Sequence, residues 1–380
     1  MDFDFTDDQV SLRDAVARWV EKGFSFERRH AIAKAGGKTR EVYTELAELG
    51  LTGLAVPESH GGMGFGAIEA MVVMEELGRG LVNAPYAAGA LVAPTLLSAA
   101  PAAVQAAWLP KIASAEALVV LAHQERTARY RLHHVTTRAM AGGPAGNGHS
   151  LTGTKSLVPA GDEADAFIVP ARLLGADTDA AGIGLFLVER GATGATVRGY
   201  PTQDGSRAAE LGLAGTPGTL ITADGGPLLE HAADVGIAAV CAEAIGLMDK
   251  LVAVTVEYMN TRKQFGATLA SFQALRHRIA DVKMQLELAR SMSYFASLKM
   301  GDAPAARRRA LAQAKLQLGQ SMRFVGQQCI QLHGGIGVTD EYIASHYFKR
   351  LTVMEMTFGD TLHQLGEVSA RMQDTAGVFA

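Results

Sequence analysis

A short polar segment carries residue types that suit an anionic ligand. Arg262, Gln264 and Phe265 stand within four positions, and Gly266 follows them. The guanidinium of an arginine is a planar fork of N–H donors that matches phosphate oxygens, and a nearby aromatic ring can pack against adenine or another ring system. The segment therefore predicts a binding site for a phosphate-bearing ligand, with an ordinary solvated helix–helix turn as the alternative.

Two long helices must position this segment. Apolar residues three and four positions apart mark one face of a helix, and they precede the segment at Ile237, Val240, Cys241, Met248, Leu251, Val252 and Thr255. The same spacing resumes after it at Phe272, Leu275, Ile279, Val282, Leu286 and Ala289. We therefore expect two helices that meet at a turn presenting Arg262, Gln264 and Phe265 together.

Composition limits the class of protein. The chain has 380 residues, of which 48% are hydrophobic, and a formal net charge of −4. This length allows a large core, and the charge argues against electrostatic binding of nucleic acid. Cys241 and Cys329 lie in apolar helical patterns, so we expect buried thiols and neither a disulfide nor a metal site. Low cysteine use, with no export signal and no membrane-spanning apolar run, favours a cytoplasmic location.

Hydrophobic periodicity divides the chain into three predicted domains. Helical patterns dominate residues 1–115 and 231–380, whereas residues 116–230 show short apolar runs between turn residues. Such runs are typical of a β-barrel or sandwich, and long helices can pack as a four-helix bundle. The predicted fold class is therefore α+β. Strands are expected at Leu118–Ala122, Ser150–Thr152, Phe167–Pro170, Gly184–Glu189 and Thr219–Thr222, and N-terminal helices from Thr6 and at 41–49, 87–99 and 102–114.

Other polar groups have simpler interpretations. Glu75 and Glu76 could be paired catalytic carboxylates, but we expect a solvated helix face. The basic run 307–309 is also expected to be solvated, because charge runs usually are. His277 is expected to be structural, and His333 has no second ligand at metal spacing, so no metal site is predicted.

Two motifs in the last third of the chain resemble those of a known family. RKQFG at 262–266 leads into FQALRHRIAD at 272–281, and QLHGGIGV at 331–338 precedes Glu341 and Tyr342. Both resemble flavin-contacting motifs of the acyl-CoA dehydrogenase family and stand in its order, at about its separation. The resemblance extends over nearly the whole chain and implies that family's fold and FAD as cofactor. The cofactor-binding residues that it implies are Arg262, Gln264, Phe265, Gln273, Gln331, Gly334 and Gly335.

The predicted central domain departs from the family pattern where the flavin ring would bind. The family's Glu-Pro and Gly-Ser-Asp stretch corresponds to residues 122–130, where only Glu125 matches. Further on, Gly153 and Lys155 match, but Leu157 stands at a tryptophan position and Pro159 at a threonine position. Proline has no backbone N–H to donate. We therefore expect that part of the surface that would contact the isoalloxazine ring has been lost.

The usual catalytic base is also missing. Removal of the α proton of an acyl thioester needs a carboxylate in a dry pocket, and the family places a glutamate directly before a glycine. Counted from Tyr342, this position is Phe358, before Gly359, and the position used by a minority of members is Gly236. The nearest acids, Glu355 and Asp360, are the candidate bases. The alternative is that both are surface or capping acids.

These retained and lost motifs leave three hypotheses for function. In the family, each flavin is shared between two subunits, and the neighbour's arginine loop and Gln-Gly-Gly motif hold the adenosine diphosphate half. The chain resembles small subunits of two-gene enzymes of the pimeloyl-CoA-dehydrogenase or steroid side-chain type. The implied function is FAD-dependent α,β-dehydrogenation of an acyl-CoA, by this chain or by a homo- or hetero-tetramer containing it, with an electron-transfer flavoprotein as acceptor. The alternative is a non-catalytic partner subunit that supplies the nucleotide-binding half to a competent paralogue. A scaffold without flavin is the third possibility.

Overall fold

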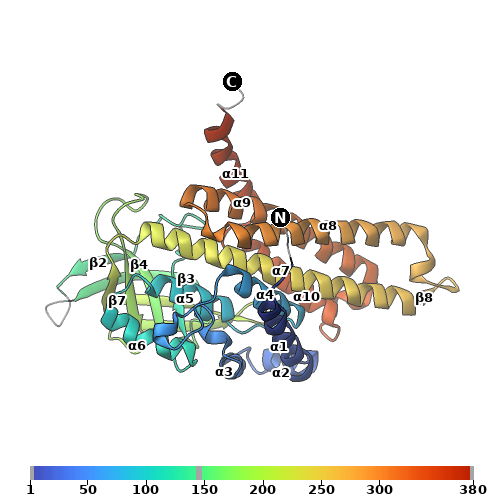
Figure 1. Ribbon diagram of the computed structural model, residues 1–380, viewed down its shortest axis with the longest axis horizontal. Coiled ribbons are helices and arrows are strands. Elements are labelled where there is room, and N and C mark those ends of the chain that lie inside the picture. Colours follow the sequence, from blue (N-terminus) through green and yellow to red (C-terminus); the bar gives the residue numbers. More distant parts are fainter. Residues whose placement is uncertain (1–3, 143–147, 377–380) are drawn as a thin grey trace. The chain divides into compact units, whose positions relative to one another are not determined.

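The computed structural model describes residues 4–142 and 148–376 and divides into two compact units (Figure 1). Unit 1 comprises Met1–Ala31, Ala67–Val82 and Ile237–Ala380, and unit 2 comprises Ile32–Gly66 and Asn83–Gly236. Segments far apart in the sequence thus share one unit. The three-domain division at residues 115 and 230 stays a prediction.

Unit 1 is built from helices. They include α1 (Asp7–Gly23), the first part of α2 (Phe26–Lys34), α4 (Ala67–Arg79), most of α7 (Gly226–Thr261), α8 (Gln273–Leu298), α9 (Pro304–His333), α10 (Ile343–Met356) and α11 (Thr361–Ala376). The start of α1 is as predicted: the Thr6 hydroxyl accepts from the Gln9 amide, and the Gln9 side chain accepts from the Thr6 amide. α7 and α8 run side by side and meet at β8 (Lys263–Gln264) (Figure 1).

The core of unit 1 lies between α7, α8, α9 and α10. The apolar residues predicted to form one face of α7 are buried, including Ile237, Met248 and Leu251. Cys241 and Cys329 belong to the same core as free thiols, as expected from their apolar neighbours in sequence. Burial of such side chains supplies the main favourable free energy of folding, at about 25 cal/mol per Å² of apolar surface.

Two glycines let α4 and α7 touch through their backbones. A Cβ atom at Gly246 would lie 1.8 Å from the carbonyl oxygen of Glu75, and one at Gly78 would lie 2.2 Å from that of Glu243. Any side chain at these positions would separate the helices. The backbone contact therefore sets how closely α4 lies against the bundle.

This close contact overturns the prediction that Glu75 and Glu76 lie on a solvated helix face. Their exposed fractions are 8% and 5%. Glu76 pairs with Arg79, and Glu75 faces Arg290 at 4.0 Å. Sequence periodicity on α4 did not reveal this, because the close contact also needs Gly246, on a helix distant in the sequence.

Unit 2 is organised around a seven-stranded sheet. Its strands are β1 (Val119–Leu121), β2 (Arg138–Ala141), β3 (His149–Pro159), β4 (Ala166–Arg172), β5 (Ile183–Glu189), β6 (Ala195–Pro201) and β7 (Arg207–Thr222). β1 and β2 pair with β4 in parallel, and the other pairings are antiparallel. Four of the five predicted strands lie within β3, β4, β5 and β7, and the fifth, Leu118–Ala122, exceeds β1 by one residue at each end. β2 and β6 were not predicted, because both are largely exposed and lack an apolar run.

Helices surround this sheet within unit 2. They are α3 (Arg40–Glu48), a π-helical turn (Ala87–Val92) continuing into α5 (Ala93–Leu97), and α6 (Ala102–Ala113), close to the predicted ranges. One buried cluster joins α5, α6 and the first turns of α7 to the sheet through residues such as Leu97, Leu109 and Leu229. Over the described ranges of the chain, the helices are too short or too polar to cross a membrane.

The glycine contact predicts that Gly246→Ala destabilises unit 1. Alanine favours a helix over glycine by about 1 kcal/mol, but its methyl group would meet the Glu75 carbonyl, and such overpacking costs about 1–3 kcal/mol. The control is Gly366→Ala in α11, where a Cβ would meet nothing within 4 Å. Urea denaturation should show a loss for the first variant and none for the second. Equal behaviour of the two would contradict the contact.

Burial of Glu75 predicts a pH-dependent stability. Desolvation raises the pKa of this carboxyl from 4.5 to about 7, although Arg290 and Arg79 oppose the rise. The folded chain then holds a proton that the unfolded chain releases near pH 4.5. The contribution of this protonation to the free energy of unfolding is lost as the pH rises through 7. Glu75→Gln should therefore gain stability over the native chain between pH 5 and pH 8, by about 1–3 kcal/mol.

The control for this experiment is Glu287→Gln. A bond from Lys283 lowers the pKa of that exposed carboxyl from 4.5, so it is ionised in both the folded and the unfolded chain from pH 5 to pH 8, and the stability difference for this variant should stay constant over that range. Denaturation curves at the two pH values test both variants. A flat difference for Glu75→Gln would show that the carboxyl is ionised throughout.

Candidate functional site

The predicted turn between α7 and α8 is a β-hairpin. β8 pairs with β9 (Ala267–Thr268), so that Gln264 lies opposite Ala267. The two residues between them, Phe265 and Gly266, have φ values of +53° and +79°. Positive φ at both central residues is the type I′ geometry that matches the twist of paired strands. The turn therefore projects from the end of the helix pair as a defined element.

The hairpin presents its ligand-binding residue types to solvent. Arg262 and Gln264 are exposed, and the Phe265 ring is 93% exposed. Within the described part of the chain, the Arg262 guanidinium makes no hydrogen bond or ion pair. Its N–H donors are thus available to an anion.

A stack of rings brings the second motif to the same end of unit 1. The His333 ring, at the end of α9, lies 4.7 Å from the ring of Tyr258 in the last turn of α7 and 5.1 Å from that of Tyr342. The His333 Nδ1 atom lies 2.8 Å from the Cys329 carbonyl oxygen. This histidine is a packing residue that fixes where α9 ends relative to Arg262.

The remaining predicted cofactor residues lie around this end. Gln331, Gly334 and Gly335 are exposed, and a Cβ at either glycine would meet nothing within 4 Å. The chain thus leaves open space where a ligand could approach its backbone closely. Gln273 is exposed at the start of α8, directly after the hairpin.

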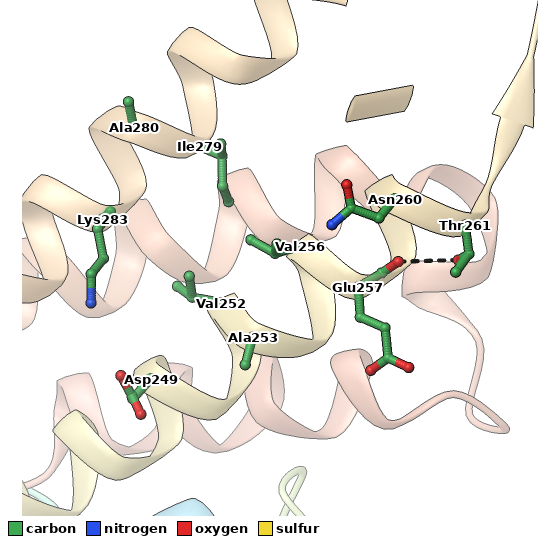
Figure 2. Close-up of a pocket in the computed structure, with 10 residues that line it drawn as sticks. All are labelled: Asp249, Val252, Ala253, Val256, Glu257, Asn260, Thr261, Ile279, Ala280 and Lys283. Atoms are coloured by element: carbon green, nitrogen blue, oxygen red, sulfur yellow. Dashed lines mark hydrogen bonds between the residues drawn. The ribbon is translucent and has the colours of Figure 1, made fainter. Parts of the chain in front are cut away.

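A groove between α7 and α8 lies next to the hairpin. Figure 2 shows Val252, Val256 and Ile279 facing one another, with Asp249 and Lys283 toward one end. Glu257, Asn260 and Thr261 line the other end, and the Thr261 hydroxyl donates to the Glu257 carbonyl oxygen. The sequence analysis missed this groove. Val256, off the predicted core face of α7 and 39% exposed, was the available signal.

In unit 2, the residues that match the family pattern have structural partners. The Lys155 ammonium donates to Glu125 at 2.7 Å, and both side chains are buried. Glu125 also accepts from the amides and hydroxyls of Thr136 and Thr137. Burial alone would raise the pKa of Glu125, but Lys155 and the hydroxyls hold it at about 2. This cluster fastens β3 to the segment after β1.

The positions that depart from the pattern lie on β3 beyond this cluster. The pairing of β3 with β7 is irregular between Lys155 and Val158. Leu157 lies in this irregularity with φ +51° and is 51% exposed. Pro159, without an N–H, follows at the end of the strand. These side chains offer no hydrogen-bond donor to a ring system.

The two candidate bases lie on either side of the turn between α10 and α11. Glu355 is buried and accepts from the amide and hydroxyl of Thr361, at 2.9 and 2.5 Å. Asp360 accepts from the His363 amide at 2.8 Å, which is a cap of α11. Phe358 packs its ring against the core of unit 1. Both acids thus have capping partners, and the assignment of either as base stays a prediction.

A further cluster of ligand types lies between α2 and α10. His30 and His346 lie 4.0 and 3.6 Å from carboxylate oxygens of Asp340. The two His346 ring nitrogens already lie 2.8 Å from the Arg29 guanidinium and from the Asp340 carbonyl oxygen. A cation there would face Arg29, so we interpret the cluster as a polar contact between helices. The expectation of no metal site stays a prediction.

Two family models match the chain on either side of the sheet. "Acyl-CoA dehydrogenase, N-terminal domain" matches residues 6–116, and "Acyl-CoA dehydrogenase, C-terminal domain" matches residues 224–373. The chain belongs to the acyl-CoA dehydrogenase family. The predicted family, fold class, FAD cofactor and reaction class of the family are thereby confirmed.

Similar proteins cover the chain along its length. Acyl-CoA dehydrogenase FadE27 of Mycobacterium tuberculosis is 26% identical, over 99% of this chain and 100% of the relative. Acyl-CoA dehydrogenase IpdE2 of Mycolicibacterium smegmatis is 28% identical, over 97% and 99%. The solved ChsE4–ChsE5 complex from Mycobacterium tuberculosis has a chain that is 26% identical, with a TM-score of 0.88 over 98% of this chain and 99% of that one.

The cap at α11 predicts a small structural role for Asp360. Asp360→Ala should lower the free energy of unfolding by about 1 kcal/mol because the His363 amide loses its acceptor. Asp360→Asn keeps an acceptor oxygen and should lose much less. Urea denaturation of the two variants tests this. Equal losses would show that the carboxylate charge matters more than the cap.

Proposed function

We propose that this chain is the nucleotide-holding subunit of an FAD-dependent acyl-CoA dehydrogenase assembly. The exposed hairpin carries the proposal, because it presents an unpaired guanidinium and a bare phenylalanine ring beside the Gly334–Gly335 turn. Arg262 would hold diphosphate oxygens, and Gln264, Gln273 and Gln331 would supply amide contacts. The two glycines would admit the ligand to the backbone.

The side chains of this chain suit the nucleotide half of FAD better than its ring half. The exposed donors of the hairpin suit the diphosphate and adenosine half. Leu157 and Pro159 offer the ring half no donor, and the nearby Lys155 is committed to Glu125. When bound, FAD supplies the acceptor for the β hydrogen as hydride. We infer that this chain holds the nucleotide half of a flavin whose ring lies on a neighbouring chain.

The α10–α11 turn also supports a role for this chain in holding the nucleotide and not in removing the proton. Removal of the α proton needs a carboxylate free to face the substrate, but Phe358 occupies the usual position and both nearby acids serve as caps. We therefore favour a mixed assembly in which a related chain supplies the base. The second candidate is an active homo-oligomer with Glu355 as base, favoured by the burial of that carboxyl beside Gly359.

The substrate class and partners follow from the family and its two-chain members. ChsE4–ChsE5 is a complex, and we propose a corresponding tetramer with a paralogue that carries the base. We expect the substrate to be an acyl-CoA of the dicarboxylic or steroid side-chain type and the acceptor to be an electron-transfer flavoprotein. A cytoplasmic location is proposed from the two free buried thiols.

The stoichiometry of bound FAD tests the assembly. The chain purified alone should retain little FAD, and co-expression with a paralogue bearing the Glu-Gly base motif should give about one FAD per pair of chains. Absorbance of the flavin against protein concentration measures this ratio. Full occupancy in the chain alone, with bleaching on addition of an acyl-CoA, would instead favour the homo-oligomer.

Arg262→Ala tests the hairpin within that assembly. Loss of a charge-assisted contact to phosphate should weaken FAD retention by about 1.5–3 kcal/mol, measured by titration of the apo-assembly with FAD. Lys263→Ala is the matched control, since it removes an exposed cation from the same hairpin. Equal retention by both variants would remove the reason for assigning Arg262.

A further inference from the structure

A lysine lies buried in the middle of unit 1, outside the site described above. Lys315, on α9, has an exposed fraction of 0%. Its ammonium group donates to the carbonyl oxygens of Glu355, at 2.8 Å, and Gly359, at 3.1 Å. Burial of a charge without hydrogen-bond acceptors is energetically costly. These two bonds therefore show which part of the structure Lys315 holds.

The two acceptors belong to the end of α10 and to the turn that follows it. The last carbonyl groups of a helix lack partners within the helix and carry the negative end of its dipole. α10 ends at Met356, so the Glu355 oxygen is one of these carbonyls. Lys315 therefore caps α10 from a different helix and ties the same point to Gly359.

The turn that Lys315 holds has an unusual backbone. Phe358 and Gly359 have φ values of +55° and +107°. A residue with a side chain is strained in the left-handed region, so the surroundings must hold Phe358 there. The Gln364 side-chain amide donates to the Phe358 carbonyl oxygen at 2.8 Å, and the Gly359 amide donates to that of Met356 at 3.3 Å.

The turn leaves no room for another residue in place of the glycine. A Cβ atom at position 359 would lie 2.4 Å from His363 Cδ2 and 2.7 Å from Gln364 Nε2. The path of the chain from α10 to α11 is thus fixed from three sides: by Lys315, by α11 and by the Glu355 carboxylate on Thr361.

We propose that Lys315 is the positioning residue for this turn, setting the backbone from which position 358 presents its side chain. Only the interpretation of position 358 as the family's usual place for the catalytic base rests on the proposed function. All the contacts described above are present in this chain, although residue 358 is a phenylalanine. The loss of the base is then a change of side chain on a turn whose positioning contacts are intact.

Local hydrogen exchange of the apo chain tests the proposal. Lys315→Met removes the donors while keeping an unbranched side chain. It should accelerate amide exchange across residues 356–361 at least tenfold, more than in the middle of α8 or α9. The control is Leu318→Ala, which removes apolar contacts from the same core one turn along α9 but keeps the Lys315 donors. Lys315→Gln, a polar substitute, serves as the second variant.

The residues at which amide exchange accelerates decide whether the proposal holds. Acceleration confined to the turn in the Lys315 variants, and absent from Leu318→Ala, supports positioning. Unchanged exchange at 356–361, equal acceleration through the bundle, or unfolding of both Lys315 variants while Leu318→Ala folds would overturn it. Because no FAD is present, these results are independent of whether Arg262 binds the nucleotide.

The pH profile supplies a readout that simple packing would not change. Burial lowers the Lys315 pKa from 10.5 to about 8, while Cys241 on α7, Glu355 on α10 and Asp360 before α11 oppose the shift. Between pH 8 and 10.5 the unfolded chain binds the extra proton, so stability from this group rises with pH. The stability of the native chain relative to Lys315→Met should therefore rise over this window. A constant difference would mean that the ammonium is not buried as described.

Discussion

The contact of the Tyr258, His333 and Tyr342 rings decides what unit 1 can present at its hairpin end. α7 and α9 are separated by more than one helix in the sequence, and each ends in a short polar motif. The ring contacts place the end of α9 against the last turn of α7. The shared core already packs α7 against α9, and the rings extend that packing to the ends that carry Arg262 and the Gly334–Gly335 turn. These contacts bring the two motifs to the same end of unit 1.

Residues retained from the family pattern divide into two kinds. Glu125 and Lys155 match it, but their partners lie within unit 2 and their burial explains their presence without a ligand. Arg262 matches it with no partner in the described part of the chain. A match with a full set of internal partners is explained by the fold, whereas the fold described here does not account for Arg262.

Much of the fold could be predicted from local patterns. Apolar residues three and four apart located α7 and α8, and short apolar runs located β1, β4 and β5. The exposed strands β2 and β6 could not be found, because their pairing partners supply the order that their own sequences lack. Glu75 was misjudged for a similar reason, since its burial depends on Gly246, 171 positions later.

The hairpin has a consequence for how a cell must make this protein. Phe265 is 93% exposed and sits in the left-handed region, so the tip is both apolar and strained in the free subunit. Exposed apolar surface promotes aggregation when nothing covers it. Copies synthesised in excess of whatever covers the tip would therefore be prone to self-association. If a related chain covers the tip, as proposed above, matched synthesis of the two chains would keep the free pool small.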